Sequence, residues 1–147
     1  MTSIDAGIST IRTYLTYLDK RRIRWRIATA PIHRMAIALI YAQGLGPTFE
    51  RHREALAALG RYVDLNLDFE LTRDDGAFWD THHLRDGARA IDDLHREDLV
   101  VTMDNVRATG LKLRPSQEET ERLHSLRHTY AETWEGLRAA LAKLNAL

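Results

Sequence analysis

The apolar residues near the start of the chain recur at the spacing of a helix. They lie three or four positions apart, so they line one face of a 3.6-residue helix: Ile4, Ile8, Ile11, Leu15 and Leu18. Ser3 or Asp5 offers a side chain that can cap the first turn. The pattern predicts an amphipathic first helix that runs into the basic residues after Asp19.

A proline separates this helix from a strongly apolar segment. Pro31 removes a backbone donor and disfavours helical geometry at Ala30, so we expect a break there. Residues 31–41 are apolar on almost every face, which predicts a short helix buried on more than one side. Glycine and proline at 44–47 end it, and helical spacing resumes from Thr48.

Residues 63–72 fit two interpretations. Apolar and polar side chains alternate strictly from Val63 to Thr72, which is the pattern of a half-buried strand. The leucines of the same stretch also continue a helical stripe that begins at Leu56. We favour a helix, with a short β-hairpin around residues 63–79 as the alternative.

Two further helices are predicted in the second half of the chain. The first begins near Thr81, carries His95 on its apolar face and is closed by Gly110 as a C-cap. The second opens with a capping box, Ser116 at the cap and Glu119 three residues on. Its apolar residues form a heptad-like seam: Leu123, Leu126, Tyr130, Trp134, Leu137, Leu141 and Leu144.

Together these elements predict an all-α fold, a single-domain antiparallel bundle of four to five helices over residues 1–147. The length of 147 residues suits one domain. The seam runs close to the last residue, so part of it is available to a second copy or to another helical protein. The first functional hypothesis is therefore a non-enzymatic, self-associating interaction module.

Composition narrows the classes of protein further. The chain has no cysteine, which excludes disulfides and thiolate chemistry. No basic segment leads into an apolar run at the N-terminus, so we expect no signal peptide. Residues 27–45 are the most apolar stretch but carry His33 and Arg34 near the middle, which opposes a membrane span. We expect a cytoplasmic protein.

The charge is unevenly distributed although the formal net charge is zero. Residues 1–61 hold ten basic and four acidic side chains, whereas residues 62–105 hold four basic and twelve acidic ones. A basic first third facing an acidic middle third can pair within one molecule or between copies. The alternative is a set of solvated faces that differ in charge.

Histidines supply the second hypothesis, a metal-dependent enzyme or sensor. Glu121, His124 and His128 share one face of the last predicted helix, and a His-x-x-x-His pair can bind a divalent metal from successive turns. His95 and His52 are the candidates to complete the site. Glu-x-x-His is also the ligand unit of carboxylate-bridged metal bundles, although the first helix lacks a central carboxylate. A solvated helix face is the alternative.

A basic cluster supplies the third hypothesis, RNA binding or cleavage. Five cations surround one tryptophan, a combination that can hold phosphates and stack on a base: Lys20, Arg21, Arg22, Arg24, Trp25 and Arg26. An anionic membrane surface is a further possible partner. The alternative is a helix end whose cations meet Asp64, Asp68 or Asp75.

A spacing on the last predicted helix extends the RNA hypothesis to cleavage. Arg122 precedes His128 with five residues between them, which resembles helical ribonuclease domains of the HEPN type. In that family the two side chains meet at a dimer interface to cleave RNA. The resemblance covers this short motif alone, and Leu123 stands where the family prefers a polar residue.

Overall fold

The computed structural model describes residues 3–79 and 83–129, with side chains described as far as Ser125. The chain divides into two compact units, residues 1–114 and residues 115–147. The first unit holds most of the secondary structure, and the second contributes helix α7. The single domain expected over residues 1–147 stays a prediction.

Helices make up most of the described chain. Those of the first unit are α1 (Ser3–Lys20), α2 (Arg34–Ala42), α3 (Gly46–Ala57), α4 (Glu70–Arg73), α5 (Ala88–Asp93) and α6 (Val106–Leu111). Two short 3₁₀ turns, η1 (Asp75–Ala77) and η2 (Glu97–Leu99), lie between them. The second unit holds α7 (Gln117–Thr129).

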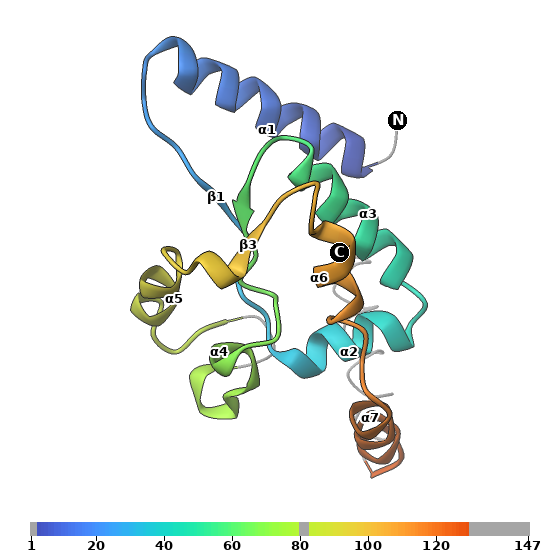
Figure 1. The fold of residues 1–147 in the computed structure, drawn as a ribbon. Coiled ribbons are helices and arrows are strands. Elements are labelled where there is room, and N and C mark those ends of the chain that lie inside the picture. The colour runs from blue at the N-terminus through green and yellow to red at the C-terminus, as the bar shows by residue number, and fades with distance from the viewer. Residues whose placement is uncertain (1–2, 80–82, 130–147) are drawn as a thin grey trace, which may run out of the picture. The chain divides into compact units, whose positions relative to one another are not determined.

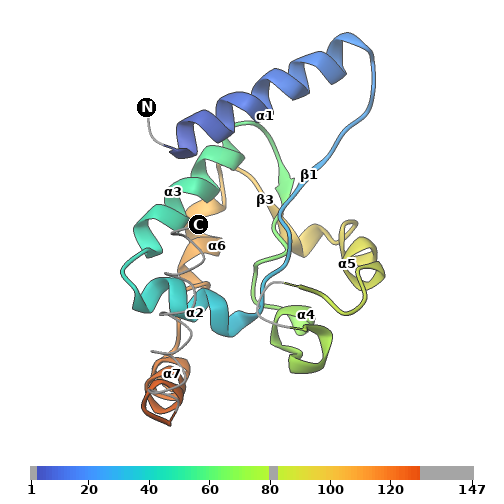
Figure 2. The ribbon, with the colours of Figure 1, turned by 180° about the vertical axis from the view of Figure 1, so that it is seen from behind.

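A small mixed sheet lies at the centre of the first unit. Its strands are β1 (Ile27–Ala28), β2 (Tyr62–Val63) and β3 (Val100–Val101), each two residues long. The central strand, β2, pairs parallel to β1 and antiparallel to β3. Figures 1 and 2 show α2, α3 and α6 on one side of the sheet and α5 on the other.

The apolar core forms around this sheet. Ile37 of α2, Val101 of β3 and Leu113 after α6 are completely buried. Ile8 brings the apolar face of α1 into the same cluster, and α1 contacts α3. The core therefore joins the small sheet to the helices that pack around it.

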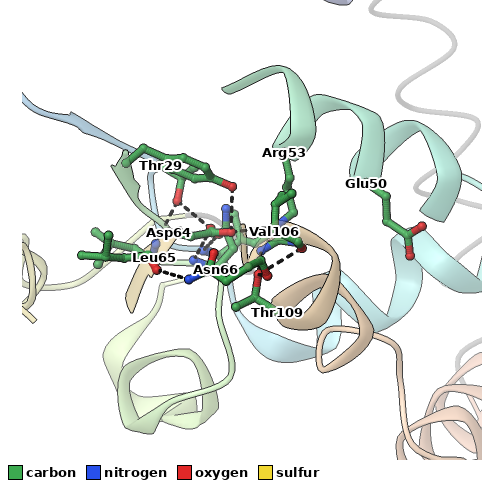
Figure 3. Close-up of polar contacts among 12 residues, drawn as sticks. Thr29, Glu50, Arg53, Asp64, Leu65, Asn66, Val106 and Thr109 are labelled. Atoms are coloured by element: carbon green, nitrogen blue, oxygen red, sulfur yellow. Dashed lines mark hydrogen bonds and ion pairs between the residues drawn. The ribbon is translucent and has the colours of Figure 1, made fainter. Parts of the chain in front are cut away.

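A buried ion pair joins the sheet to two helices (Figure 3). Arg53 Nε of α3 lies 2.7 Å from Asp64 Oδ2, and their side chains are 2% and 0% exposed. The other guanidinium nitrogens of Arg53 donate to Val106 O at 3.1 Å and to Thr109 Oγ1 at 2.8 Å, both on α6. One arginine thus ties α3 and α6 to the residue that follows β2.

The carboxylate of Asp64 has several further donors. Its Oδ1 accepts from Thr29 Oγ1 at 3.0 Å and from the Asn66 amide at 3.1 Å, and its Oδ2 accepts from Tyr62 OH at 3.3 Å. Asn66 in turn accepts from the amide of Ile32 at 3.0 Å. Each lone pair of the buried carboxylate therefore accepts a hydrogen bond. A buried ion pair needs such bonds because the surrounding medium has a low dielectric constant.

A second buried arginine fixes the end of the first unit. Arg34, at the start of α2, donates from Nη1 to Leu113 O at 3.0 Å and from Nη2 to Arg114 O at 3.1 Å. Leu113 and Arg114 follow the last residue of α6, so their carbonyls lie outside the helix. The guanidinium therefore ties the segment after α6 to the start of α2.

The prediction of an all-α bundle is wrong. Strands β1, β2 and β3 form a mixed sheet, and the predicted hairpin is not one of its pairings, because β2 pairs with β1 and β3 rather than with residues 77–79. Phe78 instead forms an isolated bridge with Leu84. A helix over residues 63–69 is also wrong, since α3 ends at Ala57 and the chain turns at Gly60 with φ of 143°.

The long helix predicted from residue 81 to residue 110 is wrong as well. The chain there forms α5, η2, β3 and α6 in succession. His95 is exposed rather than on an inner face. Gly110 lies inside α6 instead of capping a helix, and an added Cβ would lie 2.8 Å from Arg53 Nη1.

Other predicted elements are confirmed. Helix α1 covers the predicted apolar stripe, and α2 follows Pro31 as expected. The capping box of α7 has both of its bonds: Glu119 N donates to Ser116 Oγ at 3.1 Å, and Ser116 N donates to Glu119 Oε2 at 2.8 Å. The part of the predicted seam beyond Thr129 lies outside the described residues.

Among the described helices, none has the length and apolar character needed to cross a membrane.

The Arg53–Asp64 pair generates a stability prediction. Asp64→Asn leaves the guanidinium buried without its counter-charge, so we expect a loss of about 3–5 kcal/mol in the free energy of unfolding, measured by urea denaturation. The double variant Arg53→Met, Asp64→Leu removes both charges and should lose less than the single variant. The exposed pair Arg61–Glu97 serves as the control, because Glu97→Gln should cost less than about 1 kcal/mol. An Asp64→Asn effect as small as that control would contradict the prediction.

Candidate nucleic-acid interface

The segment after α1 begins with a helix-ending motif. Arg22 takes a left-handed conformation with φ of 57°, Ile23 N donates to Leu18 O at 3.0 Å, and Arg22 N donates to Asp19 O at 2.9 Å. This is the bond pattern of a Schellman motif, which usually places glycine at the left-handed position. The motif stops α1 at Lys20 and turns the chain toward β1.

The basic strip is the set of six residues predicted from the sequence to bind anions, and the structure leaves its charges at the surface. All five cations are exposed, while the indole is half-buried: Lys20, Arg21, Arg22, Arg24, Trp25 and Arg26. Trp25 Nε1 donates to Asp19 Oδ1 at 2.7 Å, which fixes the orientation of the indole ring. The strip therefore combines exposed positive charge with one oriented aromatic ring.

Exposed aromatic side chains of α1 extend the strip. Tyr14 and Tyr17 are 65% and 48% exposed, and their ring centroids are 6.3 Å apart. The guanidinium carbon of Arg21 lies 4.7 Å from the centroid of the Tyr17 ring. Large exposed aromatics beside arginines are the components of a surface that stacks bases and holds phosphates.

The acidic residues expected to neutralise the strip pair elsewhere. Asp64 is buried with Arg53, Asp68 pairs with Arg73, and Asp75 Oδ1 lies 2.8 Å from His33 Nε2. The hydrogen bonds from Arg73 lower the pKa of Asp68 below its usual range. The alternative of a helix end neutralised by these three carboxylates is therefore not supported by the described contacts.

A pocket of about 370 Å³ adjoins the strip. Its floor is formed by sheet residues Tyr62, Val63 and Val100, and Trp25 and Arg26 of the strip belong to its lining. Arg61 and Glu97 complete the lining and form an ion pair, with Arg61 Nη2 at 3.0 Å and 2.9 Å from the two carboxylate oxygens.

Parallel pairing brings the two pocket arginines together. Arg26 directly precedes β1 and Arg61 directly precedes β2, and Ile27 is in register with Tyr62. Equivalent positions of two parallel strands emerge at the same end of a sheet. Arg26 Nη1 also donates to Leu94 O and lies 3.4 Å from His95 Nδ1.

The floor of the pocket stays neutral. Burial is the largest cause that raises the pKa of the Tyr62 phenol, and the negative charge of Asp64 raises it further. The phenol therefore keeps its proton at physiological pH and donates it to Asp64. Positive charge in the pocket comes from the guanidinium groups and not from its floor.

The candidate metal ligands whose side chains the structure describes are Glu121, His124, His95 and His52. Among the side chains that the structure describes, no group of three His, Asp or Glu residues could hold a metal ion. In the first unit, His52 lies half-buried on α3, and His95 is exposed beside the cation of Arg26, which disfavours a second cation.

In the second unit, Glu121 and His124 are exposed on α7, and Glu121 accepts from Gln117 Nε2 at 2.9 Å. The side chain of His128 lies outside the described residues. A metal at His124 and His128, and cleavage of RNA by Arg122 and His128, stay predictions.

His33 has a structural task in the first unit. Its Nδ1 accepts from the amide of Met35 at 3.2 Å and caps α2, so its hydrogen is on Nε2, which faces Asp75 at 2.8 Å. The ring also packs edge-on against Phe78, at 5.5 Å between centroids. The ring thus contacts both Asp75 and Phe78, and the imidazole holds the 74–78 turn against α2.

The sequence indicated the strip but not the five other residues that line the pocket. Arg61, Tyr62 and Glu97 carry no motif, and Glu97 lies 36 positions from Arg61 along the chain. One signal was present, because Arg61 ends the basic first third of the chain. That signal does not identify a partner for Arg61, because the partner follows only from the pairing of β1, β2 and β3.

Comparison of the chain with models of known protein families, with curated proteins and with solved structures finds no match.

The left-handed backbone conformation of Arg22 generates a prediction about stability. It compares two variants that both remove the charge and differ only in the Cβ atom. Arg22→Gly removes the steric cost of a Cβ at positive φ, so we expect the free energy of unfolding to rise by up to about 1 kcal/mol. Arg22→Ala keeps that cost and should not be stabilised. Thermal unfolding of both variants by circular dichroism measures the difference, and equal melting temperatures would contradict it.

Proposed function

We propose that the protein binds single-stranded nucleic acid through the basic strip. The observation that carries the proposal is an exposed set of five cations beside an oriented indole, while Asp64, Asp68 and Asp75 pair with other residues. Cations hold the phosphates of a strand, and aromatic rings stack on its bases without regard to sequence.

Several features favour a single strand over a duplex. Tyr14, Tyr17 and Trp25 present aromatic rings that need unpaired bases to stack on. The strip leads from the end of α1 into an extended segment, so it offers no continuous helix for a major groove. The function is binding, and no catalytic group is assigned to the strip.

A self-associating interaction module remains the other candidate from the sequence. Its main support, the seam of the last helix, lies mostly beyond Thr129 and outside the described residues. The first unit adds no described feature that chooses a partner protein. Nucleic-acid binding is therefore the proposal that rests on described contacts.

Binding of a labelled oligonucleotide tests the proposal. We expect fluorescence anisotropy to show saturable binding of single-stranded RNA, with an affinity that falls as salt rises because bound cations release counterions. The triple variant Lys20→Ala, Arg22→Ala, Arg24→Ala should lower the slope of log K against log salt by about 2, since each phosphate contact contributes about 0.7 on a single strand. The matched control is Arg51→Ala, Arg107→Ala, Lys112→Ala, which removes three exposed cations from other elements. No binding at low salt, or equal losses in the two triple variants, would overturn the proposal.

Stacking on Trp25 is tested by its own fluorescence. The chain has three tryptophans, so Trp79→Phe, Trp134→Phe leaves Trp25 as the reporter. We expect the oligonucleotide to quench it, and Trp25→Ala to weaken binding by about fivefold or more, since one stacked base contributes about 1–3 kcal/mol. Trp25→Phe loses the bond to Asp19 but retains a ring, so it should lose less. Binding to anionic vesicles without binding to RNA would assign the strip to a membrane surface instead.

A further inference from the structure

The pocket beside the basic strip has the contents of a site for a single base. It joins an aromatic side chain, Trp25, to two guanidinium groups and one carboxylate, above an apolar floor. Its volume of about 370 Å³ falls within the usual range of small-molecule sites. Trp25 belongs to both the strip and the pocket, so a bound strand can place one nucleotide there.

The carboxylate decides which base fits. Glu97 is an acceptor of hydrogen bonds only, so it favours a base edge that presents two donors side by side. Guanine does so with N1–H and the N2 amino group. Adenine and cytosine present one donor next to a ring acceptor, which a carboxylate repels, and uracil presents one donor between two carbonyl oxygens.

We infer that the pocket binds one guanine nucleotide of the strand. The guanine stacks on Trp25 and donates from N1 and N2 to Glu97, and its phosphate lies on Arg26. This inference rests on the proposed function and names the base that the site selects.

The ion pair between Glu97 and Arg61 allows a base to replace Arg61 as the partner of the carboxylate. Arg61 contacts both oxygens of Glu97 through one nitrogen, Nη2, and the two side chains are 61% and 79% exposed. An exposed ion pair contributes little free energy, so a small change in the side chains can free the carboxylate edge. Arg61 then remains as a second cation beside the phosphate.

Arg26 is positioned for the phosphate by contacts on one of its nitrogens. Nη1 donates to Leu94 O and lies near His95 Nδ1, which holds the side chain at the pocket. A guanidinium has five N–H donors, so the other nitrogens can still donate to a phosphate. The carboxylate of Glu97 repels that phosphate and so favours one orientation of the nucleotide.

Free nucleotides and matched oligonucleotides test the inference. Isothermal titration should give tighter binding of guanosine monophosphate than of the adenosine, cytidine and uridine monophosphates, by about fivefold or more for a paired set of hydrogen bonds. An RNA with one central guanine should likewise bind better than the all-uridine RNA of the same length. Glu97→Gln should abolish both preferences, because its side chain offers one acceptor and one donor. Asp98→Asn is the matched control, since Asp98 pairs with Arg96 and does not line the pocket.

The outcomes separate this inference from the proposed function. Equal binding of the two RNAs, or a guanine preference that survives Glu97→Gln, overturns the guanine pocket while strand binding stands. Absence of RNA binding together with Glu97-dependent binding of guanosine monophosphate overturns the proposed function and supports the pocket. Absence of both overturns both.

Discussion

The structure of the first unit depends on one buried ion pair, between Arg53 and Asp64. A carboxylate without exposure to solvent would be strongly destabilising alone, and so would the guanidinium beside it. Together they impose directions on three elements, because the contacts of Arg53 reach α6 and those of Asp64 reach the segment after β1. A sheet of two-residue strands offers few ladder bonds of its own. The polar network therefore supplies much of the specificity that longer strands would give.

The same network links the core to the surface site. Tyr62 donates to Asp64 from inside the unit and is also one of the residues that line the pocket. The position of β2 relative to α3 thus sets the position of Arg61, which directly precedes the strand. The charges that we assign to nucleic-acid binding lie next to strands that the buried pair holds in place.

The sequence predicted correctly those elements that a local pattern of side chains specifies. Helix α1 has an apolar stripe, and the start of α7 has a capping box, and in both the local pattern is sufficient. It failed over residues 63–72, where polar residues alternate with apolar ones and yet Asp64 and Asn66 are buried. Polarity there marks the ion-pair network instead of the solvent side. The long helix predicted over residues 81–110 is wrong because β-branched Val100 and Val101 pair with β2, a distant contact that helical spacing cannot reveal.

The candidate site also has one part that the sequence predicted and one part that it did not. The basic strip is continuous in sequence, so composition alone located it, and its exposure agrees with a binding surface. The pocket is assembled from segments around residues 25, 61 and 97, which only the pairing of the strands brings together. Its specificity-determining residue, Glu97, lies in a 3₁₀ turn without any recognisable motif.

The buried guanidinium of Arg53 also restricts which residue can stand at position 110. The guanidinium passes close to the Cα of Gly110, and its three nitrogens are fixed by Asp64, Val106 and Thr109, so it cannot swing aside for a larger residue. Position 110 and position 53 are therefore expected to vary together among related chains. A lineage that places alanine at 110 would need a shorter side chain at 53 and, in consequence, an uncharged residue at 64.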